Sequence, residues 1–179
     1  MRKQTADRIS TSAYRAFLAA GTCLPLVRRG RRSGDQLYCA VETLGLGLLA
    51  VKTLKALVPE RRPDNGKPNS FPSSHATLAV STAVVAGDID REHAPRWYAG
   101  ALVICASRVL LNRHRPVDVA AGALLGWGLA RRILATEFGG CETGQRALTN
   151  PDVIRPRPAR SGGGGGAPAE AGGPSRHRP

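Results

Sequence analysis

The chain alternates between five stretches that carry no charged side chain and connecting segments that are rich in Arg, Pro and Gly. Together with their flanks, the uncharged stretches predict helices over residues 12–27, 38–58, 72–88, 97–113 and 117–135. A helix needs about 20 mostly apolar residues to span a bilayer; the second and fifth come close, and the other three are shorter. We therefore expect an all-α fold, a membrane-embedded bundle of four core crossings plus one ambiguous N-terminal segment.

The positions of the basic residues favour the membrane over a soluble bundle. Arginines crowd residues 28–32, before the second predicted helix, and recur at Arg131 and Arg132, at the end of the fifth. Four crossings between residues 38 and 135 would place both clusters on one side of the membrane, as the positive-inside rule requires. Three aromatic residues that suit a membrane interface begin helices on that same side: Tyr38, Trp97 and Tyr98. A soluble helical bundle, whose core helices have this length, is the alternative.

The N-terminal segment leaves several arrangements open. Arg15 and Pro25 interrupt it, so it could span the membrane, re-enter it or lie on its surface. Basic residues precede the apolar stretch, but Asp7 and Arg8 break the pattern and no clear cleavage site follows. We expect an uncleaved hydrophobic segment rather than a signal peptide.

Averages over the whole chain give a different impression. The 179 residues suit one domain. A mean hydropathy of −0.20 argues against a polytopic membrane protein, and a net charge of +13 indicates a partner such as nucleic acid or an anionic membrane surface. However, residues 1–37 alone hold eight basic and two acidic residues, and a Gly-rich tail follows residue 136. We therefore divide the chain into a basic N-terminal region (1–37), a helical core (38–135) and a Gly/Pro/Arg-rich tail (136–179) that we expect to be disordered.

Two predicted turns, residues 59–71 and 112–116, face the side opposite the arginine clusters and hold most of the residues suited to catalysis. With the adjoining helix ends they bring together three cations, two histidines and a carboxylate: Lys55, Arg62, Arg108, His75, His114 and Asp118. Lys and Arg side chains hold phosphate oxygens, and helix N-termini add N–H donors and a favourable dipole. The pattern predicts a phosphate site.

The local sequence also suggests how two of these groups are arranged. Ser73 or Ser74 can cap the helix that begins near His75. His114 and Asp118 are four residues apart, so the carboxylate can accept from one imidazole nitrogen and leave the other as a nucleophile or base. Taken singly, each residue has an ordinary explanation; a His–Asp pair at this spacing is also common on helix surfaces. Their order along the chain favours a catalytic site.

Three blocks carry a resemblance to a known family: K-x6-RP, PS-x-H and SR-x5-H-x3-D. The ten residues that specify them are Lys55, Arg62, Pro63, Pro72, Ser73, His75, Ser107, Arg108, His114 and Asp118. In order and spacing they resemble the type 2 phosphatidic acid phosphatase family, which also includes bacterial class A acid phosphatases and vanadium haloperoxidases. The resemblance covers residues 38–135. The chain departs from the family at Ser74, where Gly is commoner, and in having fewer than the usual six crossings.

The resemblance implies hydrolysis of a phosphomonoester or diphosphate through a phosphohistidine, without a metal or other cofactor. His114 would attack phosphorus, Asp118 would orient and charge the imidazole, and His75 would protonate the leaving group. The other residues of the site divide into phosphate ligands (Lys55, Arg62, Arg108, Ser73, Ser74) and supporting residues (Pro63, Pro72, Ser107). The four cysteines form no CxxC pair, so they predict neither a zinc site nor a redox motif.

Location and resemblance together predict the substrate and the compartment. A site at the membrane interface suits phosphatidic acid, phosphatidylglycerol phosphate or polyprenyl mono- and diphosphates. Arg-rich, Lys-poor usage indicates a high-GC bacterial genome, so we expect a multi-pass protein of the bacterial inner membrane with its site on the periplasmic face.

Three other interpretations compete, while the oligomeric state stays open. A soluble or periplasmic acid phosphatase of the same superfamily would need a cleaved signal and less apolar helices. A basic nucleic-acid-binding protein would interleave aromatics with cations on one helix face; here aromatics are 4% of the chain and the cations lie at segment ends, so we expect no nucleic-acid partner. A non-catalytic membrane scaffold would not need the set of catalytic residue types.

Overall fold

The computed structural model describes residues 2–28, 30–64 and 66–149. This part of the chain is helical and contains no strand, which confirms the all-α prediction. The elements are α1 (Arg2–Arg28), α2 (Ser33–Leu57), α3 (Ser74–Ile89), the short 3-10 helix η1 (Arg91–His93), α4 (Ala94–Leu110) and α5 (Pro116–Thr149).

The helices that correspond to α2, α3 and α4 were predicted to within a few residues, but the outer ends of α1 and α5 were not. Helix α1 begins at Arg2 rather than at residue 12, and α5 continues to Thr149 rather than ending at 135. Hydropathy marks where a helix is buried, whereas charged residues are good helix formers and do not end a helix. The remainder of the predicted disordered tail, residues 150–179, lies outside the described residues.

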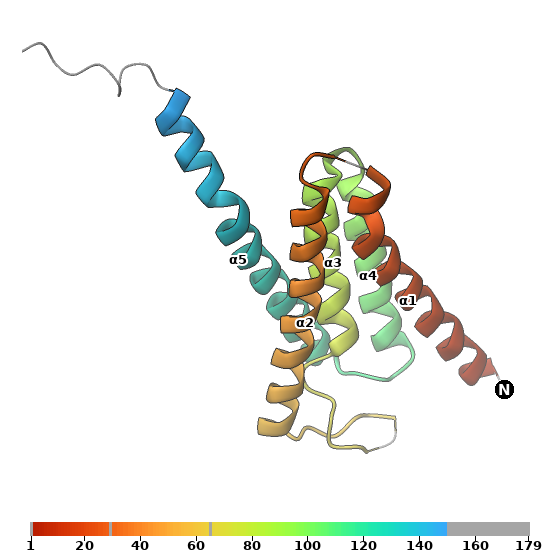
Figure 1. Ribbon diagram of the computed structural model, residues 1–179. Coiled ribbons are helices and arrows are strands. Elements are labelled where there is room, and N and C mark those ends of the chain that lie inside the picture. The colour runs from red at the N-terminus through yellow and green to blue at the C-terminus, as the bar shows by residue number, and fades with distance from the viewer. Residues whose placement is uncertain (1, 29, 65, 150–179) are drawn as a thin grey trace, which may run out of the picture.

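Helix α3 lies at the centre of the bundle and contacts each of the other four α-helices. Helices α2 and α4 run beside it, while α1 and α5 lie at an angle on either side (Figure 1). The α2–α3 and α4–α5 connections meet at one end of the bundle, which we call the histidine end (residues 58–73 and 111–115). The α1–α2 and α3–α4 connections lie at the other end. The two turns predicted to share a face therefore do so.

Glycines of α5 allow its backbone to approach that of α3 directly. A methyl group at Gly122 would lie 2.6 Å from the carbonyl oxygen of Ser73, and one at Gly126 would lie 2.1 Å from that of Thr77. Such small-x-x-x-small spacing is a common route to close helix packing. This contact places the beginning of α5 against the beginning of α3, where the catalytic residues were predicted.

Within the described residues, α2 is the one helix long and apolar enough to cross a membrane. Helices α3 and α4 have 16 and 17 residues, which is short for a full crossing. The four predicted crossings are therefore not confirmed. Apolar side chains are nevertheless well exposed on the outer faces of three helices: Leu49, Leu102, Val103, Leu124 and Trp127.

Candidate active site

The loop between α2 and α3, which carries Arg62, folds back on itself at the histidine end. The backbone N–H of Arg62 donates to Lys67, its carbonyl accepts from Gly66, and the N–H of Ser70 donates to Glu60. Lys55, in the last turn of α2, donates from Nζ to the carbonyl of Asn69 near the end of the same loop. These contacts hold the first two predicted cations beside the start of α3.

Ser73 is the N-cap of α3 and is occupied by structural contacts. Its hydroxyl accepts from the N–H of Ala76, at 3.5 Å, and its own N–H donates to the carbonyl of Asp118, at 3.0 Å. It follows Pro72, which is buried and has a cis peptide bond to Phe71. The N–H of Ser73 is therefore engaged within the protein, whereas Ser74 opens the helix and is partly exposed.

His75 lies in the first turn of α3 with its ring against a side chain of α1. The ring centroids of His75 and Tyr14 are 4.2 Å apart, and the two rings are tilted by 39°. The Nε2 atom of His75 is buried and has no hydrogen-bond partner within the described part of the chain. Arg108, His114 and Arg62 all act electrostatically on this ring, which places it among the other predicted site residues.

His114 and Asp118 are both buried, and a serine that the sequence motifs do not include contacts both of them. Nδ1 of His114 lies 3.9 Å from Oδ2 of Asp118, too far for a hydrogen bond. The hydroxyl of Ser70 donates to Asp118 Oδ2 at 2.5 Å and lies 3.4 Å from His114 Nδ1. Asp118 Oδ2 also accepts the backbone N–H of Arg115 at 3.0 Å, closing a capping arrangement at the start of α5. The prediction of a direct His–Asp hydrogen bond is wrong, because the two groups are 3.9 Å apart and Asp118 Oδ2 accepts from Ser70 and Arg115 instead.

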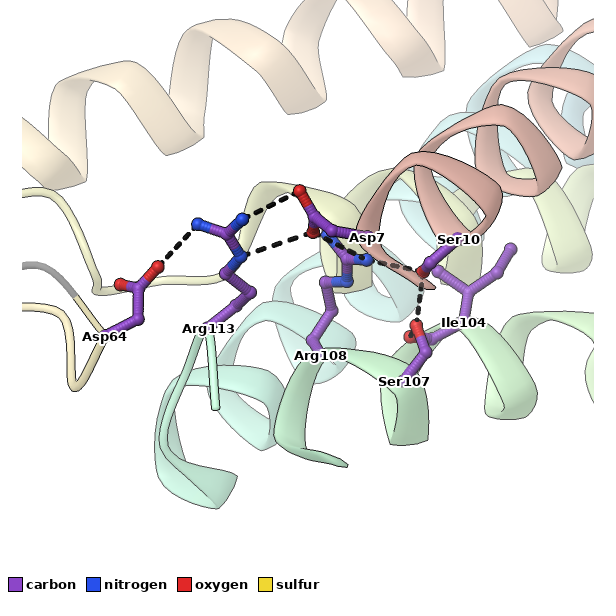
Figure 2. Close-up of polar contacts among 7 residues, drawn as sticks. All are labelled: Asp7, Ser10, Asp64, Ile104, Ser107, Arg108 and Arg113. Carbon is purple, nitrogen blue, oxygen red and sulfur yellow. Dashed lines mark hydrogen bonds and ion pairs between the residues drawn. The ribbon is translucent and has the colours of Figure 1, made fainter. Parts of the chain in front are cut away.

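Arg108 is buried near the end of α4 and is held by α1 (Figure 2). One of its terminal nitrogens donates to the hydroxyl of Ser10 and lies 3.9 Å from the carboxylate of Asp7. Ser10 is also 2.9 Å from the hydroxyl of Ser107. Asp7 in turn forms an ion pair with Arg113, at 2.7 Å. Helix α1 therefore reaches the predicted phosphate site, a role that its hydropathy did not suggest.

Three buried nitrogen atoms of the site lack any hydrogen-bond partner within the described residues: Arg62 Nε, Arg108 Nε and His75 Nε2. Most buried polar atoms in proteins are hydrogen-bonded, so a group of unpaired ones needs an explanation. The two guanidinium N–H groups are obligate donors with permanent charge. An anion bound among these side chains would satisfy them.

His114 is the neutral base of this cationic site. Burial, together with the nearby charges of Arg62 and Lys55, lowers the pKa of His114 to about 4. Near pH 7 the imidazole is therefore uncharged and retains a lone pair. Among the described residues, His, Cys, Asp and Glu side chains form no group of three or more that could hold a metal ion.

The site residues that sequence reasoning missed are Ser70 on the loop and Asp7, Ser10 and Tyr14 on α1. Asp7, Ser10 and Tyr14 are spaced three and four residues apart, so they share one face of α1. That spacing indicates a shared face of the helix, but it does not show which other helices this face contacts. Ser70 carried no comparable pattern.

A helical bundle with a buried neutral histidine, a carboxylate and two incompletely paired arginines at one end has the features of an anion-binding protein. The family model of the PAP2 superfamily matches residues 50–139, half of the chain and all ten motif residues. The chain belongs to the PAP2 superfamily. No solved structure matches it.

Proposed function

We propose that the protein is a membrane phosphatase that hydrolyses a lipid phosphate or a polyprenyl mono- or diphosphate through a phosphohistidine. Membership of the PAP2 superfamily indicates phosphatase activity. The observation that carries the proposal is the set of unpaired buried nitrogens on Arg62, Arg108 and His75, beside the neutral imidazole of His114. Phosphoryl transfer needs positioning and positive charge above all, and these side chains supply both.

In the proposed reaction, Nε2 of His114 attacks phosphorus and the bond from phosphorus to the leaving oxygen breaks. His75 gives its proton to that oxygen. Burial and the nearby charges of Arg108, His114 and Arg62 lower the pKa of His75 to about 4 in the free protein, so in this scheme His75 gains its proton when the bound phosphate anion offsets those cations. Water then attacks the phosphohistidine, His75 takes up a proton from it, and inorganic phosphate leaves with His114 restored. Lys55, Arg62 and Arg108 hold the equatorial oxygens; removing one such donor typically costs on the order of 10²–10³ in rate.

The lipid part of the proposal is supported by the outer surface of the bundle. Helix α2 is long and apolar enough to span a bilayer, and large apolar side chains of α4 and α5 are exposed. The arginines of the α1–α2 connection lie at the end of the bundle opposite the histidine end. With those arginines on the cytoplasmic side, the histidine end would face the periplasm of a bacterial cell.

A phosphatase of the same superfamily that acts on water-soluble esters is the second candidate. One observation favours it: α3 and α4 are shorter than a full bilayer crossing. Such an enzyme would not discriminate between a lipid phosphate and a small aryl phosphate.

Phosphate release from purified protein in detergent micelles tests the function. The substrate panel is phosphatidic acid, phosphatidylglycerol phosphate, a polyprenyl diphosphate and p-nitrophenyl phosphate. We expect the wild type to hydrolyse at least one lipid substrate faster than the aryl ester, and His114→Ala to fall to the level without enzyme. His93→Ala is the matched control, because His93 lies at the opposite end, where it pairs with Asp90, and it should retain wild-type rates. Full activity of His114→Ala would refute the nucleophile, and a preference for the aryl ester would favour the second candidate.

A further inference from the structure

Ser70 is completely buried and contacts both members of the proposed catalytic pair. Its hydroxyl donates to Asp118 Oδ2 at 2.5 Å and lies 3.4 Å from Nδ1 of His114. The histidine and the carboxylate are themselves 3.9 Å apart. The serine hydroxyl therefore links the two side chains, which do not hydrogen-bond to each other directly.

The number of protons on Ser70 decides which nitrogen of His114 carries hydrogen. A serine hydroxyl has one proton, and a carboxylate can only accept. Because the proton of Ser70 goes to Asp118, the oxygen of Ser70 can only accept from His114. Nδ1 must then be the protonated nitrogen, and Nε2 keeps the lone pair that the attack on phosphorus requires.

We propose that Ser70 is a positioning residue that holds His114 in the Nδ1–H tautomer and connects it to Asp118 through a serine bridge. The inference rests on the proposed function, in which Nε2 of His114 is the nucleophile. Ser70 does not contact the substrate in this scheme, and it acts through the imidazole.

Both ends of the bridge are fixed by the backbone. The N–H of Ser70 donates to the carbonyl of Glu60 at 2.9 Å, which anchors the serine to the start of its own loop. Asp118 Oδ2 also accepts the N–H of Arg115 at 3.0 Å. Since hydrogen bonds to the backbone hold both the serine and the carboxylate, the bridge can fix the plane of the ring as well as its tautomer.

The charged surroundings of His114 explain why such a bridge would be needed. Lys55 on α2 and Arg62 on the loop face the ring as cations, His75 faces it from α3, and Asp118 faces it from α5. The two cations oppose the positive charge that develops on the imidazole during phosphoryl transfer. Asp118 is the only carboxylate among these four groups. The serine bridge links it to the imidazole by hydrogen bonds.

Nitrogen-15 NMR of histidine-labelled full-length protein in detergent tests the bridge without relying on activity. The His114 signals are assigned by their loss in His114→Ala. In the wild type near pH 7 we expect Nδ1 to be protonated and Nε2 to be the unprotonated nitrogen. In Ser70→Ala the Nδ1–H population should fall and the two tautomers should mix. An Nε2–H tautomer in the wild type would overturn the proposal even if the variant failed to fold.

Single-turnover kinetics supply the second readout. We expect Ser70→Ala to slow formation of the phosphoenzyme about 10–100-fold, as is typical when a residue that orients a functional histidine is removed, with little change in KM. Ser70→Thr, which keeps a hydroxyl, should recover most of the rate. Ser81→Ala is the matched control, because Ser81 is equally buried but donates to the carbonyls of Thr77 and Gly126, away from His114.

The two readouts separate failure of this inference from failure of the proposed function. A Ser70→Ala protein with an unchanged His114 tautomer and the rate of Ser81→Ala would overturn the serine bridge. An inactive wild type that still shows the Nδ1–H tautomer, and loses it in Ser70→Ala, would overturn the phosphatase proposal while supporting the bridge.

Discussion

At the scale of single residues, the chemical state of a side chain depends on what surrounds it. His114 is four residues from a carboxylate, which by itself would raise an imidazole pKa. Instead, burial and the cations Arg62 and Lys55 dominate, and the pKa falls to about 4. A histidine in this state is a nucleophile at neutral pH and needs no prior deprotonation.

The titration of His114 gives a first prediction at this scale. Because its pKa is lowered to about 4, the ring should stay neutral as the pH falls through the ordinary range for histidine and gain a proton only near pH 4, which an NMR titration of the His114 ring measures. Removing one of the responsible cations in Arg62→Ala should raise the midpoint. Arg61→Ala removes the same charge from a neighbouring exposed position and should leave it nearly unchanged. A wild-type midpoint at the ordinary histidine value would contradict the electrostatic account of the site.

At the scale of helices, the packing of α5 on α3 aligns two motifs that are far apart in the sequence. The glycines of α5 bring its backbone against Ser73 and Thr77. The N–H of Ser73 then reaches the carbonyl of Asp118, at 3.0 Å, so the second and third motifs are joined by a main-chain hydrogen bond. Helix packing therefore sets the geometry of the site.

Two glycines on the same helix test this packing. In Gly126→Ala the new methyl group would lie 2.1 Å from the backbone oxygen of Thr77, and overpacking of this kind typically costs about 1–3 kcal/mol. At Gly128 a new methyl group would meet no heavy atom within 4 Å, so Gly128→Ala should be neutral or stabilise by up to about 1 kcal/mol through helix propensity. Thermal unfolding of both variants in detergent measures the difference. Equal melting temperatures would contradict close α3–α5 packing.

At the scale of the whole molecule, a high net charge coexists with exposed apolar side chains on the helices. The chain has a net charge of +13 and a mean hydropathy of −0.20, yet its helices expose large apolar residues such as Leu102, which is 70% exposed, and Leu124, also 70% exposed. Single exposed apolar residues are normal in soluble proteins, whereas several on the outer faces of adjacent helices suit contact with lipid.

Membrane fractionation tests which environment these helices occupy. If the proposed bundle spans the bilayer, the protein should stay in the membrane pellet after washes with high salt and with alkaline carbonate, and only detergent should release it. A protein bound to anionic lipid through its basic residues alone would leave in high salt, because exposed charge interactions are screened. Release by either wash would contradict the membrane-spanning proposal and favour the enzyme for water-soluble esters.

The sequence by itself determined the helical fold class, the approximate positions of the core helices and the motif that marks His75, His114 and Asp118 as candidate site residues. These features depend on composition, periodicity and short spacings, which are local properties of the chain. It also indicated that the two turns beside the candidate site residues share one end, since consecutive antiparallel helices return every second connection to the same side.

Only the tertiary structure decided how the site is completed. Ser70 meets Asp118 across 48 positions of the chain, and Ser10 meets Arg108 across 98. Spacing predicted a direct His114–Asp118 hydrogen bond, but the fold leaves these groups 3.9 Å apart and brings Ser70 into contact with both. The physical reason is that contacts between distant segments depend on which helix faces pack together and how closely, and no short-range pattern in the sequence records that choice.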